Sequence, residues 1–155
     1  MIKKTAVTLS EVNKILFVCK GNICRSPFAQ YYSQKVFPKS IEISSSGYYS
    51  KIGRKCPKKA IKAAKEFGIQ LENHRSTLVT EDLIKEAQVI YIFDEENRQI
   101  LNSLFPFAKN KIFLLGSLNE NSPKIISDPY SKEFFQYKIT FKLISKYIDM
   151  LNNSL

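Results

Sequence analysis

The 155-residue chain contains few cysteines and a single histidine, and no apolar stretch long enough to span a membrane. Its three cysteines are not spaced with the histidine as metal ligands usually are, which argues against a structural zinc site. An odd number of cysteines also argues against a disulfide scaffold and favours a reducing compartment. We therefore expect a cytoplasmic protein with no metal, no other cofactor and no membrane insertion.

Acidic residues are also scarce, since 14 Asp and Glu face 24 Lys and Arg for a formal net charge of +10. Such a charge can attract phosphorylated partners or nucleic acid, or it can reflect a lysine-rich surface. The lysines are spread along the whole chain, which favours the second interpretation, so no nucleic-acid partner is expected. The length and the 44% hydrophobic content fit one globular domain.

The first residues, Met1 to Lys4, resemble the start of a signal peptide, but polar residues such as Ser10 and Glu11 interrupt any apolar segment after them. We expect an N-terminal extension over residues 1–13 and a single domain over residues 14–155. Continuous apolar runs predict strands at 15–19, 89–93 and 111–115, and alternation of apolar and polar residues predicts a short strand at 41–44. Helical periodicity and terminus signals predict helices at 26–36, 57–67, 81–87, 95–104 and 132–152.

This alternation predicts an α/β fold, a doubly wound four-stranded parallel sheet with helices on both faces. Ligands of such sheets bind beyond the carboxyl ends of the strands. Cys19 stands at the end of the first strand, before Lys20, Gly21 and Asn22, and a helix should begin near Ser26 and Pro27. Gly21 and Asn22 readily adopt a left-handed backbone, which suits a loop whose amides cradle a phosphate.

Cys19 and Arg25 lie at opposite ends of this loop, so a guanidinium can grip phosphate oxygens while the thiol faces phosphorus. The helix N-terminus, the loop amides and Arg25 all favour a thiolate at Cys19. The chemistry indicated is nucleophilic attack on phosphorus, giving a phosphocysteine intermediate. The structural alternative is a strand-to-helix turn holding an inert buried cysteine.

The segment Cys19-Lys20-Gly21-Asn22-Ile23-Cys24-Arg25-Ser26-Pro27 resembles the signature of the low-molecular-weight protein tyrosine phosphatases. The resemblance covers nearly the whole chain from Ile15. It implies a phosphatase I-like fold and a bacterial-type enzyme, acting on a tyrosine-phosphorylated protein such as a bacterial tyrosine kinase. It also implies that substrate phosphate is bound by the loop residues Lys20, Gly21, Asn22, Ile23, Cys24 and Ser26.

Phosphoryl transfer from an aryl ester needs a proton for the leaving phenolate and later a base for water. Asp128, in an Asp-Pro-Tyr sequence shortly before the last helix, lies where the family has its general acid. Taken alone, an Asp-Pro pair would be read as an ordinary turn. Tyr130 should then line the pocket wall and stack on a substrate ring.

Supporting roles follow from the same resemblance. Ser26 is expected to cap the helix and donate to the Cys19 sulfur, and His74 is expected to partner Asn22. Asp94 resembles a loop-supporting acid, although a plain helix N-cap fits nearly as well. Cys24 is either a partner for a reversible disulfide with Cys19 or a small buried residue.

The loop over residues 47–53 matches the length seen in bacterial members associated with polysaccharide export. Lys51 stands where those members usually have an aliphatic residue, and it could meet an acidic part of the substrate. Tyr48 or Tyr49 supplies the aromatic wall, and Tyr49 and Lys51 are the expected substrate contacts. The sequence leaves open which of these side chains faces the pocket.

Other activities are compatible with a loop of this kind. Arsenate reductases of this fold need cysteines downstream, and none follows Cys56. Protein-arginine phosphatases carry threonine where this chain has Ile23, and an apolar residue there favours the phenyl ring of phosphotyrosine. A catalytically idle, basic phosphoprotein-binding module is an alternative from another class, although the nucleophile, arginine, serine and acid are all present.

Overall fold

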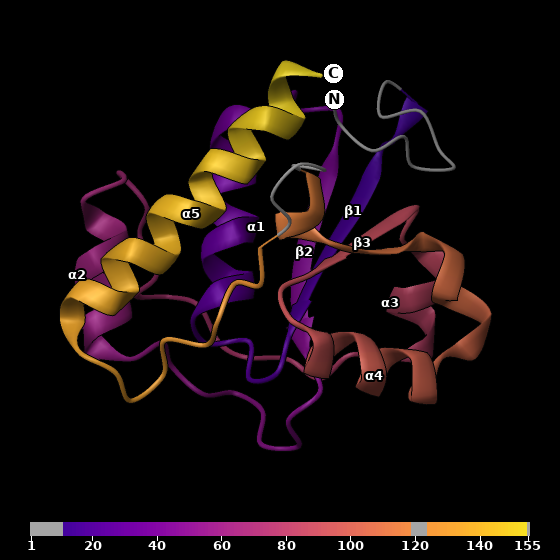
Figure 1. Cartoon of the computed structure of the whole chain (residues 1–155), viewed down its shortest axis with the longest axis horizontal. Coiled ribbons are helices and arrows are strands. Elements are labelled where there is room, and N and C mark those ends of the chain that lie inside the picture. Colours follow the sequence, from indigo (N-terminus) through magenta and orange to yellow (C-terminus); the bar gives the residue numbers. More distant parts are fainter. Residues whose placement is uncertain (1–10, 119–123, 155) are drawn as a thin grey trace.

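Four parallel strands form the centre of a computed structural model that describes residues 11–118 and 124–154 (Figure 1). Their order across the sheet is β2-β1-β3-β4, with bounds β1 Lys14–Cys19, β2 Glu42–Gly47, β3 Val89–Ile92 and β4 Ile112–Leu114. The helices are α1 Arg25–Val36, α2 Lys58–Lys65, α3 Glu81–Glu86, α4 Glu95–Leu104 and α5 Phe134–Asn153. Two short 3-10 helices flank β4, η2 over Pro106–Lys111 and η3 over Leu115–Leu118.

The central strands bury both of their faces, which explains why they read as unbroken apolar runs. Successive side chains of a strand point to opposite faces. Ile15 and Phe17 of β1 therefore join one hydrophobic cluster, and Leu16 and Val18 join the other. Helices α1, α2 and α5 cover the first face, and α3 and α4 cover the second (Figure 1). The predicted doubly wound parallel sheet is confirmed.

Helix α5 packs along α1 and α2 and closes the larger cluster. The Phe141 ring of α5 stacks on Phe28 of α1 with 4.2 Å between centroids and 2° between planes. The apolar residues at helical spacing in α5, Tyr137, Phe141, Ile144, Ile148 and Leu151, are buried, whereas Phe134 is only half-buried. This helix fixes α1, and through α1 it fixes the loop that connects β1 to α1.

The expected start of α1 at Ser26 is wrong in one respect. The helix begins at Arg25, its N-cap is Cys24, and no side chain caps it. The Ser26 hydroxyl instead lies fully buried against the Cys19 sulfur. A hydroxyl turned toward that sulfur cannot also reach the first backbone amides of the helix, so Ser26 does not act as the cap.

The start of the chain and one loop lie partly outside the described residues. Of the extension expected over residues 1–13, residues 1–10 are not described, whereas Val12 is 4% exposed within the core. The Asn13 carbonyl accepts a hydrogen bond from Glu42 N, so residues 12 and 13 pack with the domain. Residues 119–123, which follow η3, are also outside the described part.

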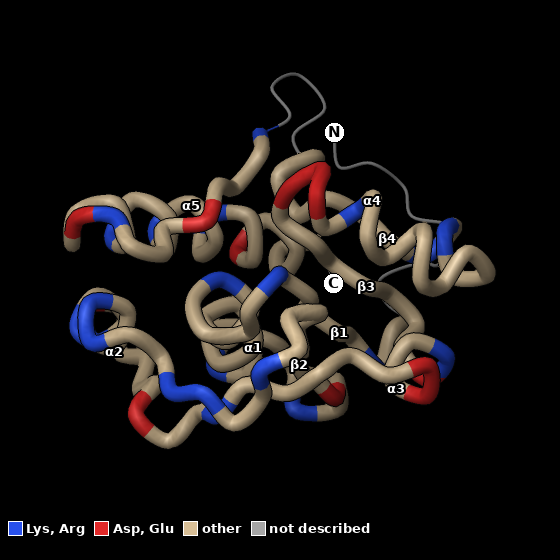
Figure 2. Tube along the Cα trace, turned by 90° about the horizontal axis from the view of Figure 1, so that it is seen from below, with Lys and Arg blue, Asp and Glu red and all other residues tan. Residues whose placement is uncertain are grey.

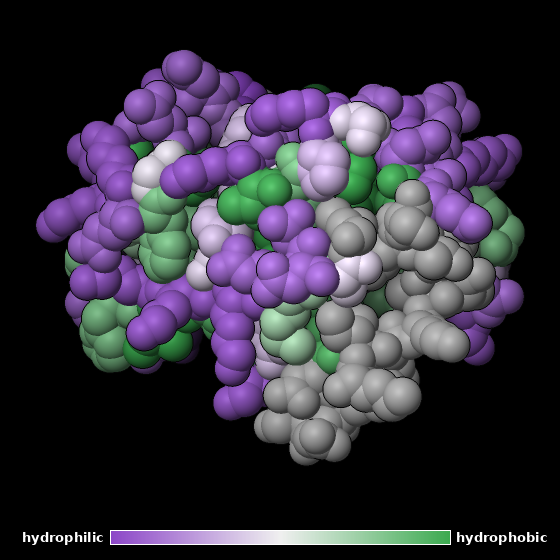
Figure 3. Space-filling view, turned by 90° about the horizontal axis from the view of Figure 1, so that it is seen from above, coloured by the Kyte–Doolittle hydropathy of each residue, from purple (hydrophilic) through white to green (hydrophobic). Residues whose placement is uncertain are grey.

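Charge is unevenly placed around the carboxyl ends of the strands. Figure 2 looks at this side and shows Lys and Arg along α2 and on the loops beside α1 and β2, with Asp and Glu on α4. On the opposite side, Figure 3 shows hydrophilic residues over most of the coloured surface, with hydrophobic residues between them. None of the helices within the described ranges is both long and apolar enough to cross a membrane.

Candidate active site

The loop between β1 and α1 lies at the carboxyl edge of the sheet, between the ends of β2 and β3. Cys19 is the last residue of β1 and pairs with Gly47 at the end of β2. A Cβ atom added to Gly47 would lie 2.6 Å from the Lys20 carbonyl oxygen and 2.9 Å from Asn22 N. Only glycine therefore allows β2 to lie this close to the loop.

The Cys19 sulfur is held by hydrogen-bond donors. Its Sγ lies 3.0 Å from the Ser26 Oγ and accepts a hydrogen bond from the backbone amide of Asn22 at 3.3 Å. The start of α1 directly behind the sulfur adds the positive end of a helix dipole. Each of these surroundings would interact favourably with negative charge on the sulfur.

Asn22 holds the loop from beneath. Its φ of 54° is left-handed, as predicted, whereas Gly21 does not adopt a positive φ. Its Nδ2 donates to Ser26 Oγ at 2.8 Å and to Ser45 Oγ at 3.0 Å, and its Oδ1 accepts from Thr77 N at 3.0 Å. With these contacts Asn22 is fully buried and its amide is saturated.

The structure brings His74 to Asn22, as expected. His74 Nε2 lies 2.9 Å from the Asn22 carbonyl oxygen and 3.2 Å from its Oδ1. Because both of these atoms accept, Nε2 carries the proton, and Nδ1 accepts from the Tyr31 hydroxyl at 3.1 Å. Burial lowers the pKa of His74, which keeps the ring neutral and suited to this arrangement.

Arg25 is the charged residue at the back of the site, with a side chain only 2% exposed. Its Nη1 donates to Asp94 Oδ2 at 2.7 Å and to the Ile126 carbonyl at 2.9 Å. Its Nη2 lies 3.6 Å from Asp128 Oδ2. Burial opposes the charge, but Cys19, Asp128 and Asp94 outweigh burial and raise the pKa of Arg25.

The Nε of Arg25 is buried and makes no hydrogen bond within the described residues. An unpaired buried donor costs about 1–3 kcal/mol, so it needs an acceptor at this position. A phosphate oxygen is a fitting acceptor, because guanidinium groups bind phosphates through two parallel N–H groups. The donor geometry thus suits an oxyanion bound in the Cys19 loop.

Asp94 both supports Arg25 and caps α4, the two roles that the sequence left open. Its Oδ2 pairs with Arg25, and its Oδ1 accepts from Asn97 N at 2.8 Å as the N-cap of α4. The Asn97 side chain completes a capping box by accepting from Asp94 N. The cap fixes the carboxylate, and the carboxylate fixes the guanidinium.

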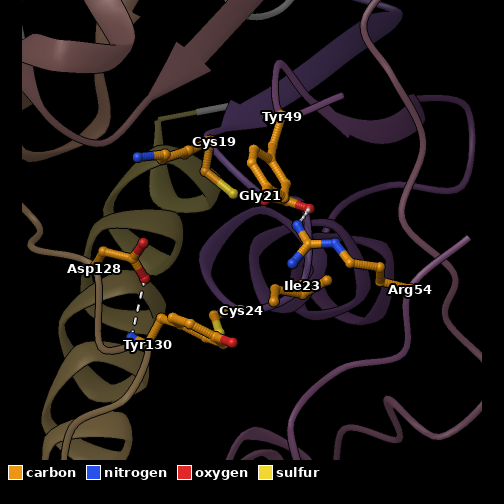
Figure 4. A pocket seen from close by; sticks show the side chains of 9 residues that line it. Cys19, Gly21, Ile23, Cys24, Tyr49, Arg54, Asp128 and Tyr130 are labelled. Carbon is orange, nitrogen blue, oxygen red and sulfur yellow. Dashed lines mark hydrogen bonds between the residues drawn. The ribbon is translucent and has the colours of Figure 1, made fainter. Parts of the chain in front are cut away.

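A cavity of about 280 Å³ opens above Cys19. Figure 4 shows Asp128 and Tyr130 on one side of this opening and Tyr49, Ile23 and Arg54 on the other. Asp128 Oδ1 accepts from Tyr130 N at 3.0 Å, which orients the carboxyl group. The lining of the cavity also includes Lys20, Gly21 and Cys24.

The structure shows which of Tyr48, Tyr49 and Lys51, all in the loop after β2, faces the cavity. Tyr49 lines the cavity, whereas Tyr48 donates its hydroxyl hydrogen to Glu96 and accepts from Asn97. Lys51 is exposed and does not line the cavity, so a contact between Lys51 and an acidic part of the substrate stays a prediction.

Arg54 lines the cavity instead and was missed from the sequence. The only available signal was that Lys51, Arg54 and Lys55 share one loop, and nothing in the sequence distinguishes them. The choice among them depends on the path of the backbone, which Gly53 turns with a φ of 73°.

The two other thiols differ from Cys19. Cys19, Cys24 and Cys56 are all free and buried. Burial, followed by the charge of Asp128, raises the pKa of Cys24 well above its usual range, and burial raises the pKa of Cys56 to about 12. Neither thiol is poised to be a nucleophile at neutral pH.

Residues 14–155 match the family model described as low molecular weight phosphotyrosine protein phosphatase. The chain belongs to this family. The low molecular weight protein-tyrosine-phosphatase Ptp of Acinetobacter johnsonii is 33% identical over 123 residues, which cover 79% of this chain and 84% of that protein. As a member of the family, the chain is a protein tyrosine phosphatase and a hydrolase.

Solved structures share the fold of this phosphatase. Vibrio vulnificus Wzb in complex with benzylphosphonate has a TM-score of 0.84 at 30% identity, over 92% of this chain and 99% of that chain. The YwlE arginine phosphatase from Geobacillus stearothermophilus also has a TM-score of 0.84, at 28% identity, over 91% of each chain. The structural neighbours of this chain therefore include Wzb and an arginine phosphatase.

Proposed function

We propose that this phosphatase hydrolyses phosphotyrosine in protein substrates, with Cys19 as nucleophile, Arg25 as phosphate ligand and Asp128 as general acid and base. The observation that carries the proposal is the pairing of a sulfur held by Ser26 and Asn22 N with a buried guanidinium whose Nε has no partner in the described chain. A phosphate placed on the loop amides would face the sulfur and supply the missing acceptor.

In the first step, the Cys19 thiolate attacks phosphorus and forms an S–P bond while the P–O bond to the phenyl ring breaks. The departing phenolate takes the proton of the Asp128 carboxyl group, so tyrosine leaves neutral. Asp128 suits this role because its side chain is 40% exposed at the rim of the cavity and is oriented by Tyr130 N. The loop amides and Arg25 stabilise the charge on the transferring phosphoryl group.

In the second step, water attacks phosphorus, the S–P bond breaks and Cys19 leaves as a thiolate. Asp128, now ionised, accepts the proton that the water loses. The Ser26 hydroxyl and the Asn22 amide favour this step as well, because they stabilise the departing sulfur anion. Inorganic phosphate is the product, and the enzyme returns to its initial protonation state.

The cavity lining supports tyrosine as the phosphorylated residue. Ile23 is 7% exposed and lines the cavity on the side of Tyr49, with the Tyr130 ring across the opening (Figure 4). A flat phenyl ring can pack against apolar Ile23 between these two aromatic rings. Phosphoarginine is the second candidate, favoured by the structural similarity to an arginine phosphatase. Its guanidinium group would leave polar N–H groups against Ile23, which is unfavourable.

The compartment proposed for this reaction is the cytoplasm, where free thiols are maintained. All three thiols are free, which supports a reducing compartment. The proposed substrate is a tyrosine-phosphorylated protein such as a bacterial tyrosine kinase. The alternative from another class is a basic module that binds phosphoproteins without hydrolysing them. The same site geometry would bind phosphate in either case, so only a measurement of turnover distinguishes the two.

Hydrolysis of p-nitrophenyl phosphate by the wild type and by Cys19→Ser tests the proposal. The wild type should turn over and the variant should fall to the background rate, because a serine hydroxyl is not ionised at this position. No turnover by the wild type would favour the binding module. Matched peptides carrying phosphotyrosine or phosphoarginine then decide the substrate, and faster release of phosphate from phosphoarginine would overturn the argument from Ile23.

A further inference from the structure

We infer that Arg54 is a specificity-determining residue that binds an acidic side chain next to the phosphotyrosine of the substrate. The inference rests on the proposed function, since it extends the same cavity toward the residues flanking the phosphorylated one. The starting observation is that Arg54 lines this cavity although no step of the proposed reaction needs it.

Arg54 is held rigidly at the mouth of the cavity. Its Nη2 donates to the Gly21 carbonyl at 3.1 Å and its Nε donates to the Lys51 carbonyl at 3.3 Å. Its guanidinium lies over the Tyr49 ring, 4.7 Å from the centroid. The backbone is fixed too, because Arg54 N donates to Ser76 Oγ and the Arg54 carbonyl accepts from Ser76 N, both at 2.9 Å.

The loop between β1 and α1, the phosphate loop, has space for this guanidinium. A Cβ atom added to Gly21 would lie 2.8 Å from Arg54 Nη2. Gly21 thus provides both the space and the acceptor for the contact, which joins the loop after β2 to the phosphate loop. A long flexible side chain on an exposed loop would lose entropy on binding, whereas one already held by several contacts loses less.

The charge of Arg54 is not neutralised by the protein. No carboxylate in residues 11–118 or 124–154 forms an ion pair with it, and the charged residues beside it on the loop, Lys51 and Lys55, are also basic. Its Nη1 forms no hydrogen bond to a described residue and can donate to a ligand. The free donor, the positive field and the half-buried position all favour an anionic group on the substrate.

A carboxylate of the substrate fits this position better than its phosphate. Arg25 and the loop amides already surround the phosphate position beside Cys19, whereas Arg54 contacts the Gly21 carbonyl and the Tyr49 ring on the side of the cavity away from Asp128 (Figure 4). A phosphotyrosine ring between Tyr49 and Tyr130 would leave its peptide backbone at the rim. A neighbouring Glu or Asp side chain would then meet the guanidinium.

The test compares two phosphotyrosine peptides that differ only in Glu or Gln beside the phosphorylated residue. For the wild type, kcat/KM should be roughly 5- to 30-fold higher with Glu, as expected for a charge-assisted hydrogen bond. Arg54→Gln should bring this ratio close to one. Lys55→Gln removes the same charge from the adjacent position and should keep most of the ratio. Arg54→Glu should instead favour a peptide with Lys at that position.

Binding of the same peptides to Cys19→Ser, with and without Arg54→Gln, separates this inference from the proposed function. A preference for Glu that depends on Arg54 would support the contact even if the wild type showed no turnover. Equal affinity for the two peptides, no binding of either, or a preference that persists in Arg54→Gln would overturn the inference. An equal loss in Lys55→Gln would also overturn it, because general charge would then explain the preference.

Discussion

Asp94 Oδ2 accepts a hydrogen bond of 2.7 Å from Nη1 of Arg25, which joins the end of β3 to the start of α1 beneath the phosphate loop. The guanidinium is almost completely buried and the carboxylate is 18% exposed. Buried charges are tolerated when they are paired and hydrogen-bonded, and they become costly when a partner is removed. The pair therefore connects the stability of the domain to the geometry of its site.

Asp94→Asn should lower the free energy of unfolding by about 3 kcal/mol, the usual cost of breaking a buried pair. The Asn side chain can still cap α4 through Asn97 N, so loss of charge rather than loss of the cap is tested. Urea unfolding followed by circular dichroism measures the change. Glu95→Gln removes an exposed acid from the same turn and should change stability by less than about 1 kcal/mol. Equal effects of the two substitutions would contradict the argument.

Asp128→Ala should slow the hydrolysis of phenyl phosphate by roughly 10²–10⁴-fold, since the phenolate must then leave without a proton. The loss should be much smaller for p-nitrophenyl phosphate, whose leaving group is more acidic. Steady-state kinetics with the two esters measure the difference. Glu133→Ala, also exposed and located just before α5, serves as the control. A uniform loss with both esters would show that Asp128 is not the proton donor.

Ser26→Ala removes the hydroxyl that lies 3.0 Å from the Cys19 sulfur. A hydrogen bond to a charged group contributes about 1.5–3 kcal/mol, so breakdown of the phosphocysteine should slow by roughly 10- to 100-fold. Rapid-quench measurements with phenyl phosphate should then show a burst of phenol release followed by slow turnover. Ser33→Ala, a buried serine later in the same helix, should give no such burst. Unchanged breakdown in Ser26→Ala would refute the role of the hydroxyl.

Iodoacetamide should modify Cys19 alone at pH 7. The pKa of Cys24 is raised by burial and by nearby Asp128, and burial raises the pKa of Cys56 to about 12, so both remain protonated thiols. Mass spectrometry of the folded protein should show one adduct, and peptide mapping should place it on Cys19. Cys19→Ser should then acquire no adduct within the same time. Modification of Cys24 in that variant would show that its thiol is more reactive than its surroundings imply.

His74 should make the stability of the protein depend on pH. Burial lowers its folded pKa below the usual value of 6.5, whereas in the unfolded chain it takes up a proton near 6.5. Its contribution is therefore fully present above pH 6.5 and is lost as the pH falls, by at most about 1.4 kcal/mol per pH unit. Urea unfolding from pH 7.5 to 5 measures this slope.

His74→Gln serves as the comparison, because the chain has no other histidine. The variant should be less stable at pH 7.5, since it loses the contacts to Asn22 and Tyr31. Its stability should nevertheless change less between pH 7.5 and 6 than that of the wild type. Parallel pH profiles for the two proteins would exclude His74 as the group responsible.

Much of the site was predictable because its residues are adjacent in sequence. Cys19, Asn22, Arg25 and Ser26 lie in one short loop, so a strand before it and a helix after it already determine how they can meet. The family resemblance, rather than the Asp-Pro pair alone, pointed to Asp128 as the general acid, and Asp128 lies at the rim of the cavity. Continuous apolar runs likewise predicted the central strands β1 and β3, since both faces of the sheet are covered. The strand predicted from alternation at 41–44 instead extends over Glu42–Gly47 as β2.

Other features depended on contacts between distant segments. Ser26 was expected both to cap α1 and to contact the Cys19 sulfur, and only the contact with the sulfur is observed. The sequence left open which residue of the loop after β2 faces the pocket, and the backbone with its turn at Gly53 places Tyr49 and Arg54 along the cavity. Local sequence preferences describe what each residue can do, and they do not describe which partner reaches it.

The sequence by itself indicated the reaction, because the proposed nucleophile Cys19 and the proposed phosphate ligand Arg25 lie in one short segment between a strand and a helix. Only the tertiary structure decided which side chains surround the substrate. Tyr49 and Arg54 come from the loop after β2, and their positions depend on Gly21 and Ser76, far from them along the chain. Such long-range contacts are made only once the sheet has brought its strand ends to one edge.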